Sequence, residues 1–105
     1  MNEKQTEILG LLVEECAEVI QAISKASRFG LSSSYKEQTN KERLQQEIGD
    51  IVAIVFILTQ RFPELLDEDA LEKSIIRKIA RLKKYVPSLA DFEADLFPTD
   101  TEQGV

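Results

Sequence analysis

Histidine is absent from this chain of 105 residues, and cysteine occurs once, as Cys16. One cysteine excludes an internal disulfide and fits a reducing compartment, and we expect Cys16 to be a small core residue on a helix. Without histidine, a metal site must be built from oxygen ligands. The same absence argues against a ferritin-like di-iron bundle, which needs Glu-x-x-His pairs.

Positive charge is also scarce, since 13 Lys and Arg face 19 Asp and Glu, for a net charge of −6. Because affinity for a nucleic-acid backbone comes from basic residues, we expect no nucleic-acid partner. Small phosphorylated ligands remain possible if metal ions bring the positive charge. The first residues lack the basic-then-apolar pattern of a signal segment, so we expect none, and the longest apolar run, residues 51–58, is too short to span a bilayer. We therefore expect a cytoplasmic protein with no membrane partner.

Apolar residues recur at helical spacing throughout, which predicts an all-α fold in one domain, residues 1–105. We expect a helical bundle of three main helices with its core in residues 3–86. A C-terminal segment, residues 87–105, should hold a short, helix-compatible piece at 89–96 and a frayed end from Pro98.

The first predicted helix spans residues 3–28 and ends at Gly30, which suits a left-handed cap. A polar loop at 31–40 follows, which could order over a ligand. The apolar stripe of this helix consists of Ile8, Leu9, Leu12, Cys16, Val19, Ile20 and Ile23.

The second predicted helix opens with Thr39 and Glu42, spaced as a capping box, and Pro63 closes it. Its residues 51–58 are apolar on all sides, so we expect part of this surface to contact another subunit. A β-strand is the rival interpretation of this run, but its continuation from a capped helix favours helix.

The third predicted helix begins near Asp67 or Asp69 and has basic residues in its last turns. Its core stripe consists of Leu71, Ile75, Ile79, Leu82 and Val86. Lys78 and Arg81 lie on one flank of that stripe.

Two acidic pairs are the most informative feature: Glu15 with Glu18, and Glu47 with Asp50. Each pair places two carboxylates one turn apart on one side of a helix. On a wheel of about 100° per residue, Glu47 points into the middle of the apolar arc of its helix. Because burying an unpaired carboxylate is costly, Glu47 needs a partner. Four converging carboxylates form the hard, all-oxygen site that Mg²⁺ or Mn²⁺ prefers.

The run Glu14-Glu15-x-x-Glu18 followed by Glu47-x-x-Asp50 resembles the metal-binding motif of the MazG-like nucleoside triphosphate pyrophosphohydrolases, in the all-α NTP pyrophosphatase superfamily. The resemblance covers roughly residues 5–85. It implies a Mg²⁺-dependent hydrolase that converts a nucleoside triphosphate into a monophosphate and pyrophosphate. It also implies a bundle completed as a homodimer or homotetramer.

The residues suit such chemistry. Ions held by the four acids would offset the charge of the triphosphate and lower the pKa of a bound water. Glu18 or Glu47 could accept the proton of that water. Candidates for the phosphates are Lys25, Arg28, Lys78 and Arg81, and candidates for stacking on the base are Phe29 and Tyr35.

Each assignment has a structural alternative. Acidic pairs are often solvated helix faces, and basic residues late in a helix favour its dipole without binding any phosphate. A non-catalytic helical adaptor, oligomeric and antitoxin-like, therefore remains the alternative function. In it, Glu47 would pair with Lys78 or Arg81 across the bundle.

Overall fold

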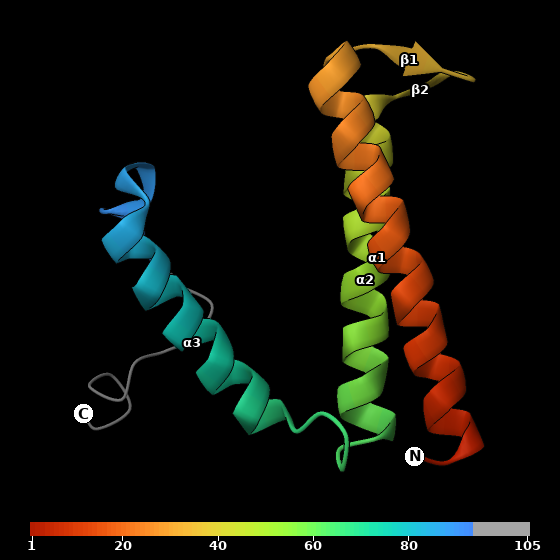
Figure 1. The fold of residues 1–105 in the computed structure, drawn as a ribbon, viewed down its shortest axis with the longest axis vertical. Helices are drawn as coiled ribbons and strands as arrows, with labels where there is room; N and C mark the ends of the chain where they lie inside the picture. Colours follow the sequence, from red (N-terminus) through yellow and green to blue (C-terminus); the bar gives the residue numbers. More distant parts are fainter. Residues whose placement is uncertain (94–105) are drawn as a thin grey trace. The chain divides into compact units, whose positions relative to one another are not determined.

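The computed structural model describes residues 1–93, which fall into two compact units, described separately below. The first unit, Met1–Leu65, holds two long helices and a small β-hairpin between them, and the second unit begins at Leu66. The elements are α1 (Glu3–Phe29), β1 (Ser34–Tyr35), β2 (Gln38–Thr39), α2 (Asn40–Arg61), α3 (Glu68–Tyr85) and the 3₁₀ turn η1 (Pro87–Leu89) (Figure 1). The predicted all-α fold with three main helices is confirmed.

The helices begin where polar side chains satisfy their first backbone N–H groups. The predicted capping box of α2 is present, because the Thr39 hydroxyl accepts from the Glu42 backbone and Glu42 accepts in return from the Thr39 backbone. Asn2 and Gln5 form an equivalent box on α1. Asp67 caps α3, where its carboxylate accepts from the Ala70 N–H at 2.9 Å.

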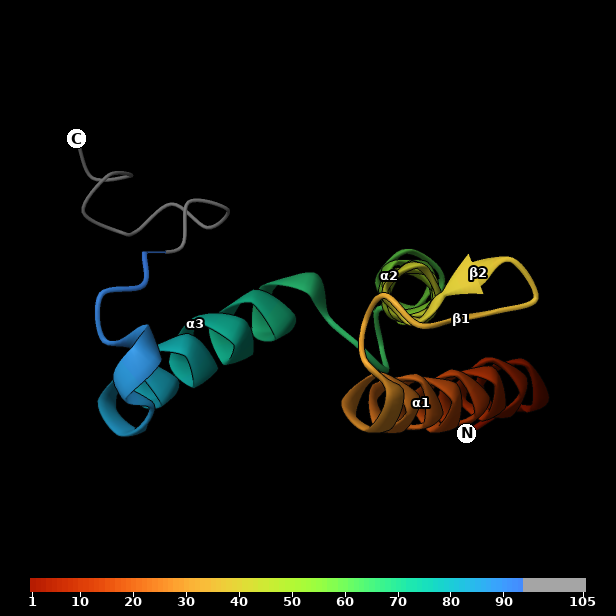
Figure 2. The same ribbon diagram turned by 90° about the horizontal axis from the view of Figure 1, so that it is seen from above.

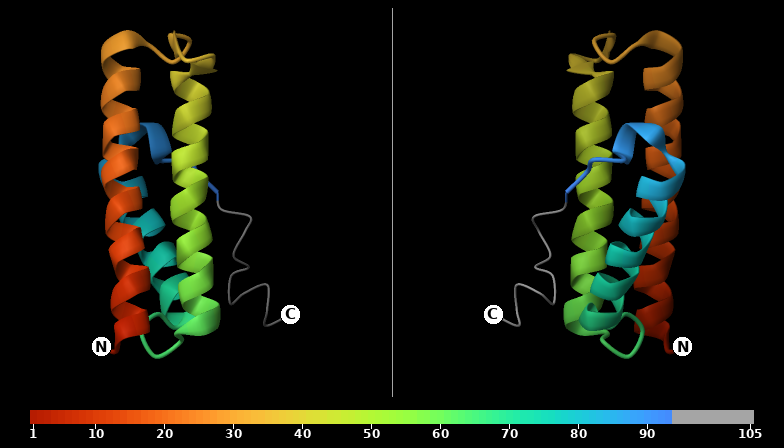
Figure 3. Two further views of the ribbon diagram at one scale, coloured as in Figure 1. Left: turned by 90° about the vertical axis from the view of Figure 1, so that its right-hand side faces the viewer. Right: turned by 90° about the vertical axis from the view of Figure 1, so that its left-hand side faces the viewer.

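The first unit is an antiparallel pair of helices. α1 and α2 lie side by side along their length, as the views in Figures 2 and 3 agree. The core between them contains Ala22, Ile54 and Leu58, of which Ala22 and Leu58 are each 2% exposed. At the end opposite the β-hairpin, the buried Gln5 amide donates to Glu64 Oε1 at 2.7 Å. This bond ties the start of α1 to the segment after α2.

The face of α1 that meets α2 differs from the predicted stripe. Ile8, Leu12 and Val19 are half-buried, as expected, but Cys16 is exposed. The prediction that Cys16 is a core residue was therefore wrong. The buried face is rotated, so that Glu15 and Ala22 lie on it. Ala22 and the carboxylate of Glu15 therefore lie on the face where the sequence pattern had predicted larger apolar side chains.

The segment predicted as a plain loop contains the two-stranded hairpin, with Ser34 opposite Thr39 and Tyr35 opposite Gln38. Its turn residues, Lys36 and Glu37, both have positive φ angles, 52° and 64°. Two-residue hairpin turns of type I′ need positive φ at both central positions. Gly30 ends α1 with a φ of 92° and a ψ of 155°, outside the left-handed helical region that we expected.

The described part of the second unit, residues 66–93, holds α3 and η1. The predicted core stripe, Leu71, Ile75, Ile79, Leu82 and Val86, is half-buried. The C-terminal piece expected at 89–96 is instead a 3₁₀ turn that starts earlier, at Pro87, because proline suits the first position of a helical turn. The rest of that prediction, from residue 94 on, and the frayed end lie outside the described residues.

The apolar run of α2 is helical, as predicted. Ile54 and Leu58 are buried, whereas Val52 and Phe56 are 60% and 64% exposed. No helix in residues 1–93 is long and apolar enough to span a bilayer. Oligomerisation through the exposed side of α2 stays a prediction.

Candidate metal centre

Three carboxylates meet between α1 and α2. Glu15 and Glu18 lie one turn apart on α1, and Glu47 comes from the facing turn of α2. One oxygen of each side chain lies within 4.8 Å of the others. Sequence reasoning had placed these three residues in one site, and we call them the carboxylate cluster.

Two members of the carboxylate cluster are poorly solvated. Glu47 is only 7% exposed. Oε2 of Glu47 and Oε2 of Glu15 are buried and have no hydrogen-bond partner among the described residues. Since a buried carboxylate oxygen without a partner is destabilising, these atoms are suited to a ligand of positive charge.

The electrostatics of the cluster agree with this view. Burial raises the pKa of Glu15, and the neighbouring charges of Glu18 and Asp50 raise it further. Burial likewise raises the pKa of Glu47, with the adjacent Glu18 as the next cause. Like charges and loss of water both disfavour the ionised form. The Arg43 guanidinium, 3.9 Å from Glu47 Oε1, does not offset these effects.

Asp50, the fourth predicted ligand, lies on α2 one turn after Glu47 and is half-buried. Its oxygens are not among those that meet within 4.8 Å. It is nevertheless close enough for its charge to raise the pKa of both Glu15 and Glu47. Glu14 is exposed and contributes a smaller charge effect on Glu15, as expected for a neighbour.

The donor set fits a hard divalent cation. Carboxylate oxygens are the ligands that Mg²⁺ and Mn²⁺ prefer, and Mg–O bonds of about 2.1 Å keep ligand oxygens within roughly 4.2 Å of each other. The observed limit of 4.8 Å is near this value, so modest side-chain rotation suffices. The orphaned oxygens of Glu15 and Glu47 would gain a partner in this way.

A recess of about 180 Å³ adjoins the carboxylate cluster. It is lined by Glu18, Gln21, Ala22, Lys25, Arg43 and Glu47. Lys25 was predicted to bind phosphate, whereas the sequence reasoning missed Gln21 and Arg43. The spacing of Arg43 and Glu47, four residues apart on one helix, is the signal that could have identified Arg43.

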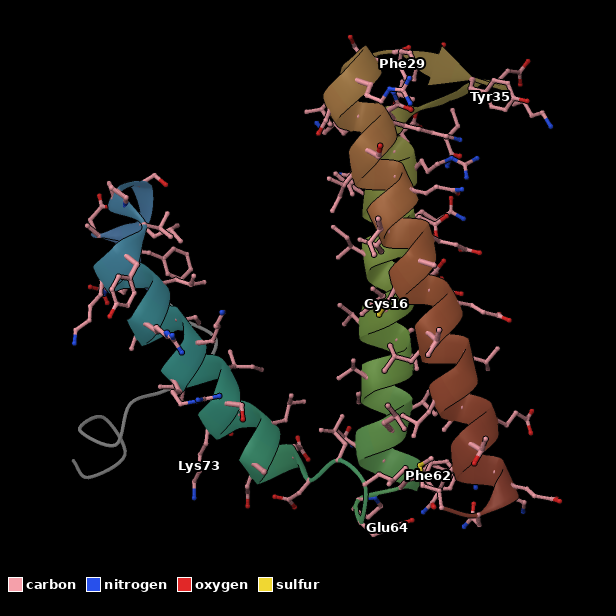
Figure 4. The ribbon with its side chains drawn as sticks, in the orientation of Figure 1. Cys16, Phe29, Tyr35, Phe62, Glu64 and Lys73 are labelled. Carbon is pink, nitrogen blue, oxygen red and sulfur yellow. The ribbon has the colours of Figure 1, made fainter. Side chains whose placement is uncertain are left out.

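Other predicted site residues lie elsewhere. Arg28 is exposed in the last turn of α1, with its guanidinium 5.2 Å from the centre of the Phe29 ring. Phe29 and Tyr35, 60% and 64% exposed, lie near the β-hairpin end of the first unit (Figure 4). Lys78 and Arg81 are exposed on α3, in the second unit.

Comparison with known families supports the resemblance on which these predictions rest. The profile of the MazG nucleotide pyrophosphohydrolase domain matches residues 3–86, which include α1, α2, α3 and the whole carboxylate cluster. No curated protein and no solved structure matches the chain significantly. Since the match spans most of the chain, the protein belongs to the MazG nucleotide pyrophosphohydrolase domain family.

Proposed function

We propose that this protein is a Mg²⁺-dependent nucleoside triphosphate pyrophosphohydrolase. Its reaction would convert a ribo- or deoxyribonucleoside triphosphate and water into the monophosphate and pyrophosphate, as part of nucleotide-pool housekeeping. The observation that carries the proposal is the pair of buried oxygens of Glu15 and Glu47 beside Glu18, which have no hydrogen-bond partner within residues 1–93. Membership of the MazG family gives the reaction class.

In this proposal, Glu15, Glu18, Glu47 and Asp50 hold the metal, with Mg²⁺ favoured and Mn²⁺ a possible substitute. When bound, the metal offsets the charge of the phosphates and lowers the pKa of a coordinated water. Glu18 or Glu47 would accept the proton that the attacking water loses at the α-phosphorus.

The basic residues would bind the rest of the triphosphate. Lys25 lines the recess beside the carboxylate cluster, so its ammonium can reach a phosphate there. Arg28, Lys78 and Arg81 remain proposed phosphate ligands. Lys78→Ala should then lower activity less than the loss of a metal ligand does. Lys78→Arg, which keeps the positive charge, should relieve the effect of Lys78→Ala.

The active unit is proposed to be a homodimer or homotetramer. The support is the exposed apolar surface of α2, where Val52 and Phe56 are each at least 60% exposed. A contiguous apolar surface is typical of an interface. Light scattering at micromolar concentration should show at least two chains, and a well-folded monomer would contradict the proposal.

A panel of nucleoside triphosphates, incubated with Mg²⁺ and with EDTA, tests the function. We expect monophosphate and pyrophosphate, in equal amounts, only with the metal. Glu18→Gln should abolish the reaction, while Glu14→Gln, an exposed neighbour on the same helix, should retain it. Release of orthophosphate alone would contradict cleavage between the α- and β-phosphates, and no turnover of any nucleotide would favour the alternative of a helical adaptor. Within the first unit, Glu47 forms an ion pair with Arg43 on α2 itself.

A further inference from the structure

Two basic side chains line the recess beside the carboxylate cluster. Lys25 projects from α1 and Arg43 from α2, and both line the same recess as Glu18 and Glu47. A volume of about 180 Å³ is far more than the roughly 10–15 Å³ that one water needs. The recess is therefore large enough to admit a phosphate group.

Arg43 is bound only loosely to Glu47. Its Nη1 lies 3.9 Å from Glu47 Oε1, which is a charge contact and too long for a hydrogen bond. The side chain of Arg43 is 41% exposed and that of Glu47 9%. The N–H groups of Arg43 are therefore not committed to Glu47, and a guanidinium offers several donors in a geometry that suits phosphate oxygens.

The two carboxylate oxygens of Glu47 have different surroundings. Its Oε1 faces Arg43, while its Oε2 is buried without a hydrogen-bond partner among the described residues. A cation bound at the carboxylate cluster would take up the charge of Glu47 and repel the guanidinium. Arg43 would then need a new anion, and the adjoining recess is where a phosphate can supply it.

We propose that Arg43 is a coupling residue, which contacts Glu47 in the metal-free protein and transfers to a phosphate of the substrate when a divalent cation binds. This inference rests on the proposed function and adds a residue and an order of events to it. Arg43 thus opposes binding of the metal alone and favours binding of metal and polyphosphate together. The two ligands are linked through one side chain, and the linkage is reciprocal.

The proposal gives Arg43→Gln two effects of opposite sign. Mg²⁺ alone should bind more tightly, by up to about fivefold, because a repulsive charge with the strength of an exposed ion pair is removed. Inorganic pyrophosphate, in the presence of saturating Mg²⁺, should bind about ten- to hundredfold more weakly, because charge-assisted hydrogen bonds are lost. Arg43→Lys keeps the charge without the planar fork, so its pyrophosphate affinity should be intermediate.

Isothermal titration of the full chain with Mg²⁺, and then with pyrophosphate at saturating Mg²⁺, measures both effects. Lys41→Gln is the matched control, since it removes one positive charge from an exposed position at the start of α2, outside the recess. Lys41→Gln should change either affinity by less than twofold. Arg43→Lys retains the charge beside Glu47, so it supplies the comparison if Arg43→Gln unfolds.

Three outcomes would overturn the proposal. The first is weaker binding of Mg²⁺ and of pyrophosphate by similar factors in Arg43→Gln, which indicates that Arg43 merely supports Glu47. The second is unchanged pyrophosphate affinity. The third is an equal effect of Lys41→Gln, which indicates only long-range charge. Failure of the proposed function is distinguishable, because a wild type that hydrolyses no triphosphate can still be titrated with both probes.

Discussion

Glu47→Gln removes one negative charge from the carboxylate cluster and keeps the size of the side chain. A ligand that binds only the folded state stabilises it by about 2.7 kcal/mol at 100 times its dissociation constant. Since 1 kcal/mol shifts the melting temperature of a domain of this size by about 4–8 °C, wild-type protein should gain roughly 10–20 °C at that Mg²⁺ concentration. Loss of even an outer-shell partner weakens metal binding by about 10- to 100-fold.

The variant should lose most of this gain. With a dissociation constant raised about 100-fold, the same Mg²⁺ concentration stabilises Glu47→Gln by only about 0.4 kcal/mol, or roughly 2–3 °C. The structural reason is that Glu47 contributes one of the three oxygens that meet within 4.8 Å, and its other oxygen has no hydrogen-bond partner in the described chain.

Without metal, the order of stability reverses, and Glu47→Gln should be more stable than wild type at pH 7. The pKa of Glu47 is raised in the folded state by burial and by Glu18. Its protonated form therefore stabilises the fold fully below the ordinary pKa of 4.5, and this contribution disappears as the pH rises through the folded pKa. The advantage of glutamine should accordingly shrink as the pH falls toward 4.5.

Thermal unfolding followed by circular dichroism tests these expectations. Measurements in EDTA compare the metal-free stabilities of wild type and Glu47→Gln, and a Mg²⁺ titration gives the metal-induced shift of each. Glu14→Gln is the matched control, because it removes the same charge from an exposed position next to Glu15. It should retain the wild-type response to Mg²⁺. If Glu47→Gln shows the same Mg²⁺-induced shift as wild type, Glu47 is not a metal ligand and the reasoning fails.

Three further predictions follow from the same structure. Asp50→Asn and Glu18→Gln should each lower turnover by orders of magnitude without loss of helix content, which steady-state kinetics and circular dichroism measure together. Leu58→Ala should cost about 2–5 kcal/mol in urea unfolding, since Leu58 is 2% exposed; a cost below 1 kcal/mol would contradict the packing of α1 on α2. Lys36→Asn combined with Glu37→Gly should stabilise the protein by about 1–2 kcal/mol in the same assay, because both residues have positive φ angles; destabilisation would contradict the described turn.

Helix boundaries were largely predictable because local chemistry sets them. Thr39 and Glu42 are spaced as a capping box, and Asp67 suits a helix start, so short-range patterns were sufficient. The hairpin was missed because its turn carries no such short-range pattern. Lys36-Glu37 lacks the Asn-Gly or Asp-Gly signal of a two-residue turn, and positive φ angles at such residues cannot be inferred from sequence.

The rotation of α1 was the main structural error. Its apolar residues form a broad stripe, and the sequence does not indicate which side of that stripe meets α2. Contact with α2 selects the side that carries Ala22 and Glu15, which leaves Cys16 exposed. The spacing of Glu15 and Glu18 placed them on one side of α1, and their meeting with Glu47 follows from the packing of α1 against α2.

The cationic side of the site was harder to predict. Lys25 and Arg43 line one recess only because α1 and α2 pack antiparallel in this register. Long basic side chains occur on most helices, and sequence alone does not separate those beside a site from those on a solvated face. Arg43 is recognisable once its distance of 3.9 Å from Glu47 is known.

The position of bond cleavage tests the central claim most directly. Hydrolysis of a nucleoside triphosphate in ¹⁸O-enriched water, with mass spectrometry of the products, identifies the phosphorus that water attacks. We predict ¹⁸O in the monophosphate and none in pyrophosphate, with both products absent for Asp50→Asn. Label in pyrophosphate or in orthophosphate, or unchanged turnover in Asp50→Asn, would contradict a metal-dependent attack at the α-phosphorus by this carboxylate site.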